Sequence, residues 1–426
     1  MRDPSVFRAA PAAKLYRGWL VVAGAFLVAM FGFGLGFYGP GIYLVVLKAR
    51  HGWSTGELAS AISVYYVLGA GLLFFVVGPL FDRWGARTVV IIGTVAMACG
   101  VVSLTLVARP WQAYTAFGVM SLGWATMSGA AINIIVAPWF ERRRGLALSW
   151  ALNGGSAGGV VVAPLLVLSI SRFGFAVGLD TAAAVMLACL IPVAMLVLRP
   201  KRPDERDAAD RRSELDNPSS SYIASPDEIA GFRLRIVLRS RAFITTTIPF
   251  ALGLTAQVGV LTHLVALVMP TLGASGAAAA VSTTTAAAIL GRLMTGVVVD
   301  RTEPRLVAAT TLGLQIIGVT LLAWAPSAAV AYTGCTLFGL GVGNLTTLPG
   351  LILAAEWPTE QFGALIGLAV GINQLTFAFG PSLVGVVRDW SGGYAPALGL
   401  CAVLQLGAAM LVLLGRSRTR AGPTGH

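Results

Sequence analysis

Along the chain, long apolar runs alternate with short polar or Gly/Pro-rich segments. Each run has about 20 or more residues, the length that a helix needs to cross the hydrocarbon core of a bilayer. The runs therefore predict an all-α membrane protein with twelve transmembrane helices, at residues 18–47, 57–80, 86–107, 111–137, 145–170, 177–198, 241–269, 275–299, 305–324, 328–354, 362–386 and 393–414.

One long polar segment interrupts this alternation of apolar runs and short connections. Residues 199–240 are charged and rich in Ser, Pro and Asp, a composition typical of a flexible linker. The predicted organisation is a tail, a six-helix bundle, the linker, a second six-helix bundle and a second tail, at 1–17, 18–198, 199–240, 241–414 and 415–426.

The two bundles carry an internal repeat. GPLFDRWGAR at 78–87 aligns with GVVVDRTEPR at 296–305, and the same shift of 218 residues relates Trp139 to Trp357. Repeated halves are common in membrane carriers, where the binding site lies between the halves near the bilayer midplane. We therefore expect two pseudo-symmetric halves with a central site.

Composition supports the bilayer as solvent. Hydrophobic residues make up 56% of the chain and charged residues 11%, whereas soluble domains carry about 25% charged residues. The net charge of +12 does not indicate nucleic acid, because the basic residues cluster between spans. The four cysteines lack CxxC spacing, and no nucleophile–base set, metal cluster or phosphate loop is recognisable. We expect no enzyme activity, no metal and no cofactor.

The distribution of Lys and Arg predicts orientation. With both termini in the cytoplasm, 24 of the 30 basic side chains lie there and five lie outside. The prediction is a multi-pass protein of a bacterial-type inner (plasma) membrane, monomeric among membrane lipids. The remaining basic side chain is Arg292, inside the predicted span 275–299.

Arg292 is the first candidate for chemistry. It lies eight residues before Asp300, so about 12 Å inside the membrane and near its midplane. A guanidinium at that depth costs at least a few kcal/mol and matches the two oxygens of a carboxylate. It could instead bind carbonyls of a neighbouring helix or line a watery vestibule. The absence of a deep Asp or Glu favours an anionic substrate.

His263 is the second ionisable candidate within a span, either as a proton relay or as a hydrogen-bonded packing residue. Polar side chains that could bind substrate, or alternatively bond neighbouring helices, are Tyr38, Tyr65, Asn133 and Asn373. Secondary polar candidates are Tyr43, Tyr66, Asn153, Gln257 and Asn344.

Twelve spans, a long central loop and the repeated Asp-Arg loop resemble the major facilitator superfamily. The resemblance implies that the loop pairs helix ends and gates the carrier. The implied gating residues are Gly78, Asp82, Arg83, Gly85 and Arg87, with a second copy at Gly296, Asp300, Arg301 and Arg305. The second copy has Glu303 in place of the middle glycine.

Residues 121–159, with PWFERRRGLAL between two Gly-rich spans, and Arg292-x-x-x-Gly296-x-x-x-Asp300 are similar to the monocarboxylate transporter family and its bacterial relatives. In that family the corresponding arginine binds the substrate carboxylate. Two family features are missing: Pro40-Gly41 and Ala288 stand where animal members have a lysine after the proline and an aspartate.

The sequence thus predicts a secondary transporter that moves a small organic monocarboxylate of the lactate or pyruvate type by alternating access. Coupling to protons remains open. The alternatives are an anion exchanger of the oxalate–formate type and a transporter-derived sensor without flux.

Overall fold

The computed structural model describes residues 16–140, 143–199, 238–299, 301–356 and 362–415. Most of the predicted linker and both predicted tails lie outside these residues. Within the described part, helices form all of the regular structure.

The first half contains α1 (Arg17–Phe33), η2 (Gly34–Tyr38), α2 (Gly39–His51), α3 (Thr55–Leu72), η3 (Leu73–Val77), α4 (Gly78–Ser103), α5 (Pro110–Met127), α6 (Gly129–Val136), η4 (Ala137–Trp139), α7 (Arg144–Ala157), η5 (Gly158–Val162), α8 (Ala163–Phe173) and α9 (Phe175–Leu196). The second half contains α13 (Arg241–Val299), α14 (Pro304–Ala323), α15 (Ala328–Val342), α16 (Leu348–Glu356), α17 (Phe362–Phe377), α18 (Gly380–Ser391) and α19 (Tyr394–Leu414).

The described part holds nine helical stretches that are long and apolar enough to cross a membrane. Two of them contain two crossings each, because the chain turns at Gly85 (φ 73°, ψ 165°) and at Gly273 (φ 67°, ψ −177°). Only glycine adopts such a positive φ without strain. Helix α15 and the following α16 make a further crossing. The twelve-helix prediction is confirmed.

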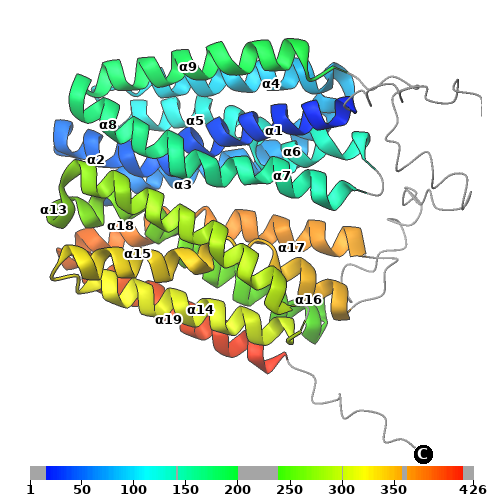
Figure 1. The fold of residues 1–426 in the computed structure, drawn as a ribbon. Coiled ribbons are helices and arrows are strands. Elements are labelled where there is room, and N and C mark those ends of the chain that lie inside the picture. Colours follow the sequence, from blue (N-terminus) through cyan, green and yellow to red (C-terminus); the bar gives the residue numbers. More distant parts are fainter. Residues whose placement is uncertain (1–15, 141–142, 200–237, 300, 357–361, 416–426) are drawn as a thin grey trace, which may run out of the picture.

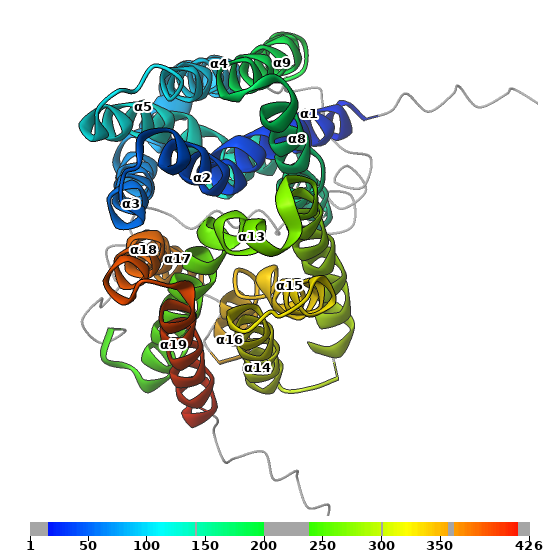
Figure 2. The ribbon, with the colours of Figure 1, turned by 90° about the vertical axis from the view of Figure 1, so that its left-hand side faces the viewer.

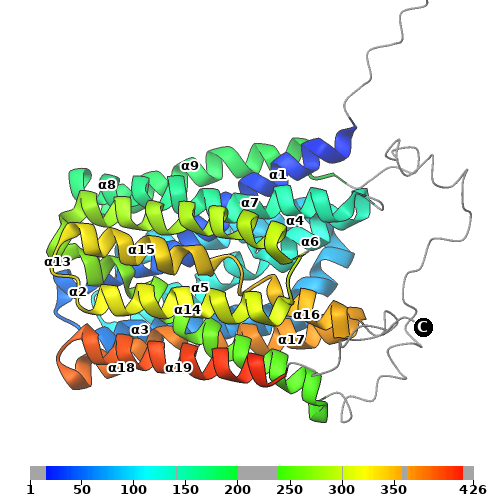
Figure 3. The same ribbon diagram turned by 60° about the horizontal axis from the view of Figure 1, so that its bottom comes forward.

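The two halves lie side by side, the first in blue to green and the second in green to red (Figures 1 and 3). The described chain begins and finishes at the same end of the bundle, which we call the terminal end. The opposite end, with the turns at Gly52, Gly174, Gly273 and Gly392, is the distal end. Figure 2 looks onto the distal end, where α3 lies beside α18 and α2 beside α13.

At the distal end the halves are joined closely. The backbone N–H of Gly56, in the first turn of α3, donates to Oδ2 of Asp389 on α18 at 2.5 Å. Arg388 donates to the other oxygen, Oδ1, at 2.8 Å. One helical level further in, the hydroxyls of Ser63 and Ser382 are 2.9 Å apart. The Gly56–Asp389 and Ser63–Ser382 bonds therefore join the two halves at the distal end.

Towards the terminal end this bonding stops. Between described residues, no hydrogen bond or ion pair joins the halves on the terminal side of the Arg292–Asn153 pair. The structure is therefore closed distally.

Asp389→Asn should weaken distal closure, because the variant loses the charge that strengthens a hydrogen bond to a helix N-terminal N–H. We expect a Val45→Cys reporter, in a chain whose native cysteines are replaced by serine, to react about three- to tenfold faster with an impermeant maleimide. Val45 lines an apolar pocket between the halves near this end.

Asp180→Asn is the matched control, since Asp180 is an exposed acid on α9 that takes no part in the junction. Equal labelling rates in the two variants would rule out a closing role for Asp389.

Candidate functional site

Arg292 lies on the second part of α13 and reaches across to the first half. Its Nη1 donates to Oδ1 of Asn153 on α7 at 3.4 Å. The guanidinium side chain is only partly buried. Arg292 therefore lies at the interface of the halves and does not face lipid alone.

Because Gly343 has no side chain, it leaves space for the guanidinium of Arg292. A Cβ at Gly343, directly after α15, would lie 2.9 Å from both Nε and Nη2 of Arg292. A planar guanidinium thus lies against bare backbone, and any side chain at 343 would displace it.

Most hydrogen-bonding capacity of Arg292 is unused. A guanidinium has five N–H donors, but the one bond found is long, and the buried Nε has no partner. No described Asp or Glu forms an ion pair with it. The side chain can therefore accept an anion without first breaking a strong internal bond.

Tyr38, the last residue of η2, stands beside this arginine. A Cβ at Gly159 of η5 would lie 2.8 Å from the Tyr38 ring and would also meet the methyl of Thr285 on α13. Thr285 lies seven residues before Arg292, on the same face of α13. No hydrogen bond links the Tyr38 hydroxyl to another described residue. Tyr38, Asn153 and Arg292 thus bring three polar groups together from three spans.

His263 lies elsewhere, inside the second half. It is 1% exposed. Its Nε2 lies 3.0 Å from the carbonyl of Pro381, and its Nδ1 lies 3.2 Å from the hydroxyl of Tyr394. A carbonyl only accepts, so Nε2 carries the proton and Nδ1 accepts from Tyr394 in the neutral ring. This arrangement ties α13 to α18 and α19.

His263→Gln should preserve substrate affinity within about threefold if the ring only positions these helices, since an amide can donate to one partner and accept from the other. His263→Leu leaves the carbonyl of Pro381 without its donor and should lower thermal stability. Uptake measured from pH 5 to 8 checks this. A pH profile flattened in both variants would instead show that His263 carries a proton.

The other three predicted binding residues are separate from Arg292. Tyr65 is fully buried and donates to the carbonyl of Gly36 at 2.8 Å. Asn133, on α6, accepts from Nη2 of Arg144 at 3.3 Å. Asn373, on α17, is 5% exposed and its Oδ1 has no partner. Their roles in binding stay predictions.

Among the secondary candidates, Asn153 accepts the hydrogen bond from Arg292 described above. Its position beside Arg292 depends on how α7 packs against α13, which no local pattern reveals. Tyr43 donates to the carbonyl of Leu35 at 3.1 Å, and Gln257 accepts from Gln315 at 2.7 Å, so both bond within their own halves.

The Major Facilitator Superfamily model matches residues 24–381 and, again, 271–425. The chain belongs to the major facilitator superfamily. The first of these matches spans the first half and most of the second, and the superfamily consists of multi-pass membrane transporters.

Several proteins of this superfamily are similar along most of the chain. Human monocarboxylate transporter 11 is 29% identical over 431 residues, covering 95% of this chain and 84% of its own. The MFS-type transporter pynF of Aspergillus niger is 26% identical over 418 residues, covering 94% and 88%. A putative anionic 4-hydroxy-benzoate permease of Thauera aromatica is 41% identical over 114 residues, only 26% of this chain and 64% of the permease.

Solved structures of the superfamily share the fold. The nucleoside transporter NupG, as its D323A mutant, superposes with a TM-score of 0.72 at 13% identity, covering 93% of this chain and all of that one. A bacterial homolog of the human lysosomal transporter Spinster, inward-facing and unoccupied, has a TM-score of 0.68 at 13% identity, covering 95% and 98%.

The first superfamily gating loop is exposed at the terminal end. Asp82, Arg83 and Arg87 are exposed and form no ion pair with a described residue, while Gly85 makes the turn. Gly78 lies one turn before them at the start of α4. The gating role of these residues stays a prediction.

The second loop differs in its bonding. Asp300 lies outside the described residues, and Gly296 and Arg301 are exposed. Arg305 is 1% exposed, and its Nε and Nη2 donate to the two carboxylate oxygens of Glu356 at 2.6 and 2.9 Å. Its Nη1 donates to the carbonyls of Thr245 and Val412, each at 3.0 Å. Arg305 therefore joins four helices of the second half, α13, α14, α16 and α19.

Proposed function

We propose that this protein is a secondary carrier that moves small organic monocarboxylates, of the lactate and pyruvate type, across the inner membrane by alternating access. The supporting observation is Arg292, a partly buried guanidinium at the interface of the halves with an unpartnered Nε and no acidic partner among the described residues.

A single cation in a low-dielectric interface is neutralised by one negative charge, and a bound monocarboxylate supplies one. A dianion would bring a second charge that no described basic side chain beside Arg292 compensates. This charge balance favours a monocarboxylate over exchange of the oxalate type. The names of human monocarboxylate transporter 11 and of the Thauera permease agree with a carboxylate.

The distribution of Lys and Arg favours a cytoplasmic location for the terminal end. The distally closed structure is then inward-facing. In the proposed cycle, the Asp389–Gly56 junction opens as the terminal end closes, and Arg292 and Asn153 stay at the pivot between the halves.

Uptake into proteoliposomes tests the proposal. We expect saturable uptake of labelled lactate or pyruvate that other monocarboxylates inhibit and that the neutral nucleoside uridine does not. Repeating uptake with and without an inward proton gradient determines coupling, and preloading with oxalate or formate reveals obligatory exchange. If the vesicles show neither uptake nor counterflow of any monocarboxylate, the proposal fails.

A further inference from the structure

An aromatic cluster lies on the first half beside Tyr38. The rings of Phe37 and Trp124 stack at 5.9 Å between centroids with 14° between planes. Phe33 meets the edge of Trp124 at 5.1 Å. Phe37 meets Tyr38 edge-on at 5.2 Å. We call Phe33, Phe37 and Trp124 the aromatic wall.

The wall has a buried layer and an accessible layer. Trp124 is 4% exposed and packs against Gly36 of η2, whereas Phe33 and Phe37 are only partly buried. Both phenylalanines lie on the segment where α1 passes into the π-helical turn η2. Such π turns recur at functional sites because they redirect side chains.

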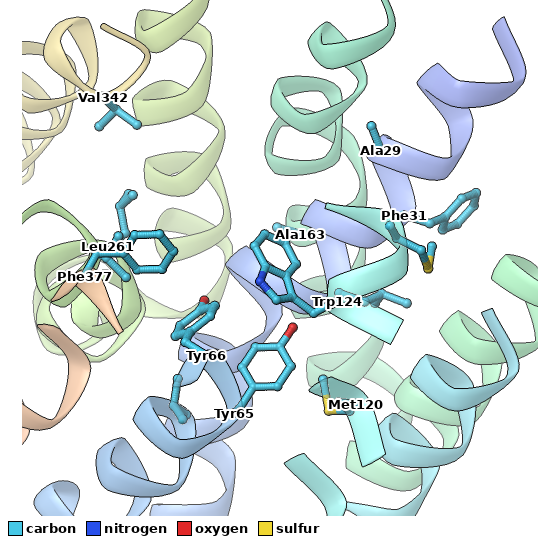
Figure 4. Close-up of a cluster of buried hydrophobic side chains, with 14 of the residues drawn as sticks. Ala29, Phe31, Tyr65, Tyr66, Met120, Trp124, Ala163, Leu261, Val342 and Phe377 are labelled. Carbon is cyan, nitrogen blue, oxygen red and sulfur yellow. The ribbon is translucent and has the colours of Figure 1, made fainter. Parts of the chain in front are cut away.

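The wall lies inside the protein and not against lipid. Phe37 is 6.3 Å from Tyr66, and Tyr66 meets Phe377 of the second half edge-on at 5.6 Å. Figure 4 shows Tyr66 between Trp124 on one side and Phe377 and Leu261 on the other. Phe37 therefore belongs to a series of ring contacts that reaches the second half.

This wall is close to Arg292. Phe37 meets the ring of Tyr38, and a Cβ at Gly159 would meet both the Tyr38 ring and the methyl of Thr285, which lies seven residues before Arg292 on the same face of α13. Helical side chains lean towards the helix N-terminus, which directs Arg292 from α13 towards Thr285 and Tyr38. One cationic group and an accessible aromatic surface thus flank the same region.

We propose that the preferred substrate is an aromatic monocarboxylate of the benzoate class, with its carboxylate on Arg292 and its ring against Phe33 and Phe37. This inference rests on the proposed carboxylate function and names its substrate class. A three-carbon acid on Arg292 would leave the wall without a contact, whereas a ring would gain both apolar burial and edge or stacked ring contacts.

Binding to the purified full-length protein, measured by calorimetry, tests the inference with benzoate, cyclohexanecarboxylate, pyruvate and neutral benzamide. We expect benzoate to bind at least tenfold more tightly than pyruvate or benzamide. Phe33→Leu and Phe37→Leu keep an apolar side chain but remove the ring. Each should weaken benzoate binding about three- to tenfold and change pyruvate binding less than twofold.

Phe173→Leu is the matched control, because Phe173 is 66% exposed near the distal end of α8, and it should change neither affinity. Melting temperatures identify variants that fail to fold, and the other ring variant then carries the comparison.

Equal affinity for benzoate and pyruvate, or equal losses for both acids in the ring variants, would overturn the aromatic inference. Arg292→Gln separates it from the proposed function. If pyruvate alone binds and needs Arg292, the carboxylate function stands and the aromatic inference falls. If both acids still bind to Arg292→Gln, the carboxylate function itself falls, and the inference falls with it.

Discussion

Replacing Arg292 should remove monocarboxylate transport. In Arg292→Gln the substrate loses its charge partner and a planar pair of donors, and each hydrogen bond to a charged group contributes about 1.5–3 kcal/mol. Two such bonds correspond to a loss of affinity of about 100-fold or more. Arg292→Lys keeps the charge but not the fork, so we expect a smaller loss of about tenfold or more.

Initial rates of uptake over a range of substrate concentrations measure this effect. Arg172→Gln removes an exposed guanidinium at the distal end and serves as the control for lost charge. Uptake by Arg292→Gln and Arg292→Lys at the rate of the control would show that Arg292 is a structural residue.

Arg305→Met should destabilise the second half strongly. The wild-type guanidinium is 1% exposed and donates to Glu356 and to two backbone carbonyls from three other helices. Breaking a buried ion pair by removing one partner costs about 3–5 kcal/mol, because buried groups are left unpaired. The Glu356 side chain is 29% exposed, so water offsets part of its loss and we expect the lower part of this range.

Thermal or denaturant unfolding of the purified protein measures the change. Arg87→Met is the matched control, since Arg87 is the exposed counterpart 218 residues earlier, and its replacement should change stability by less than about 0.5 kcal/mol. Combining Arg305→Met with Glu356→Leu should recover part of the loss. Equal effects of Arg305→Met and Arg87→Met would exclude a structural role for the buried pair.

Sequence reasoning on His263 left two roles open. The fold brings Pro381 and Tyr394 to its two ring nitrogens, although they lie 118 and 131 residues away in the chain. Tyr65 is similar, because its hydroxyl is bonded to a carbonyl of η2. A polar residue within a span looks the same in sequence whether its partner is substrate or a neighbouring helix, and only packing identifies that partner.

The sequence alone determined the twelve crossings, the two related halves and the single guanidinium at membrane depth. These features follow from local rules, since a run of about 20 apolar residues must cross the bilayer as a helix whatever its neighbours are. The tertiary structure decided which groups meet: Asn153 with Arg292, Glu356 with Arg305, Asp389 with Gly56, and Phe37 with Trp124. These pairings join helices far apart in the chain, so they depend on packing between helices, which no local pattern of residues encodes.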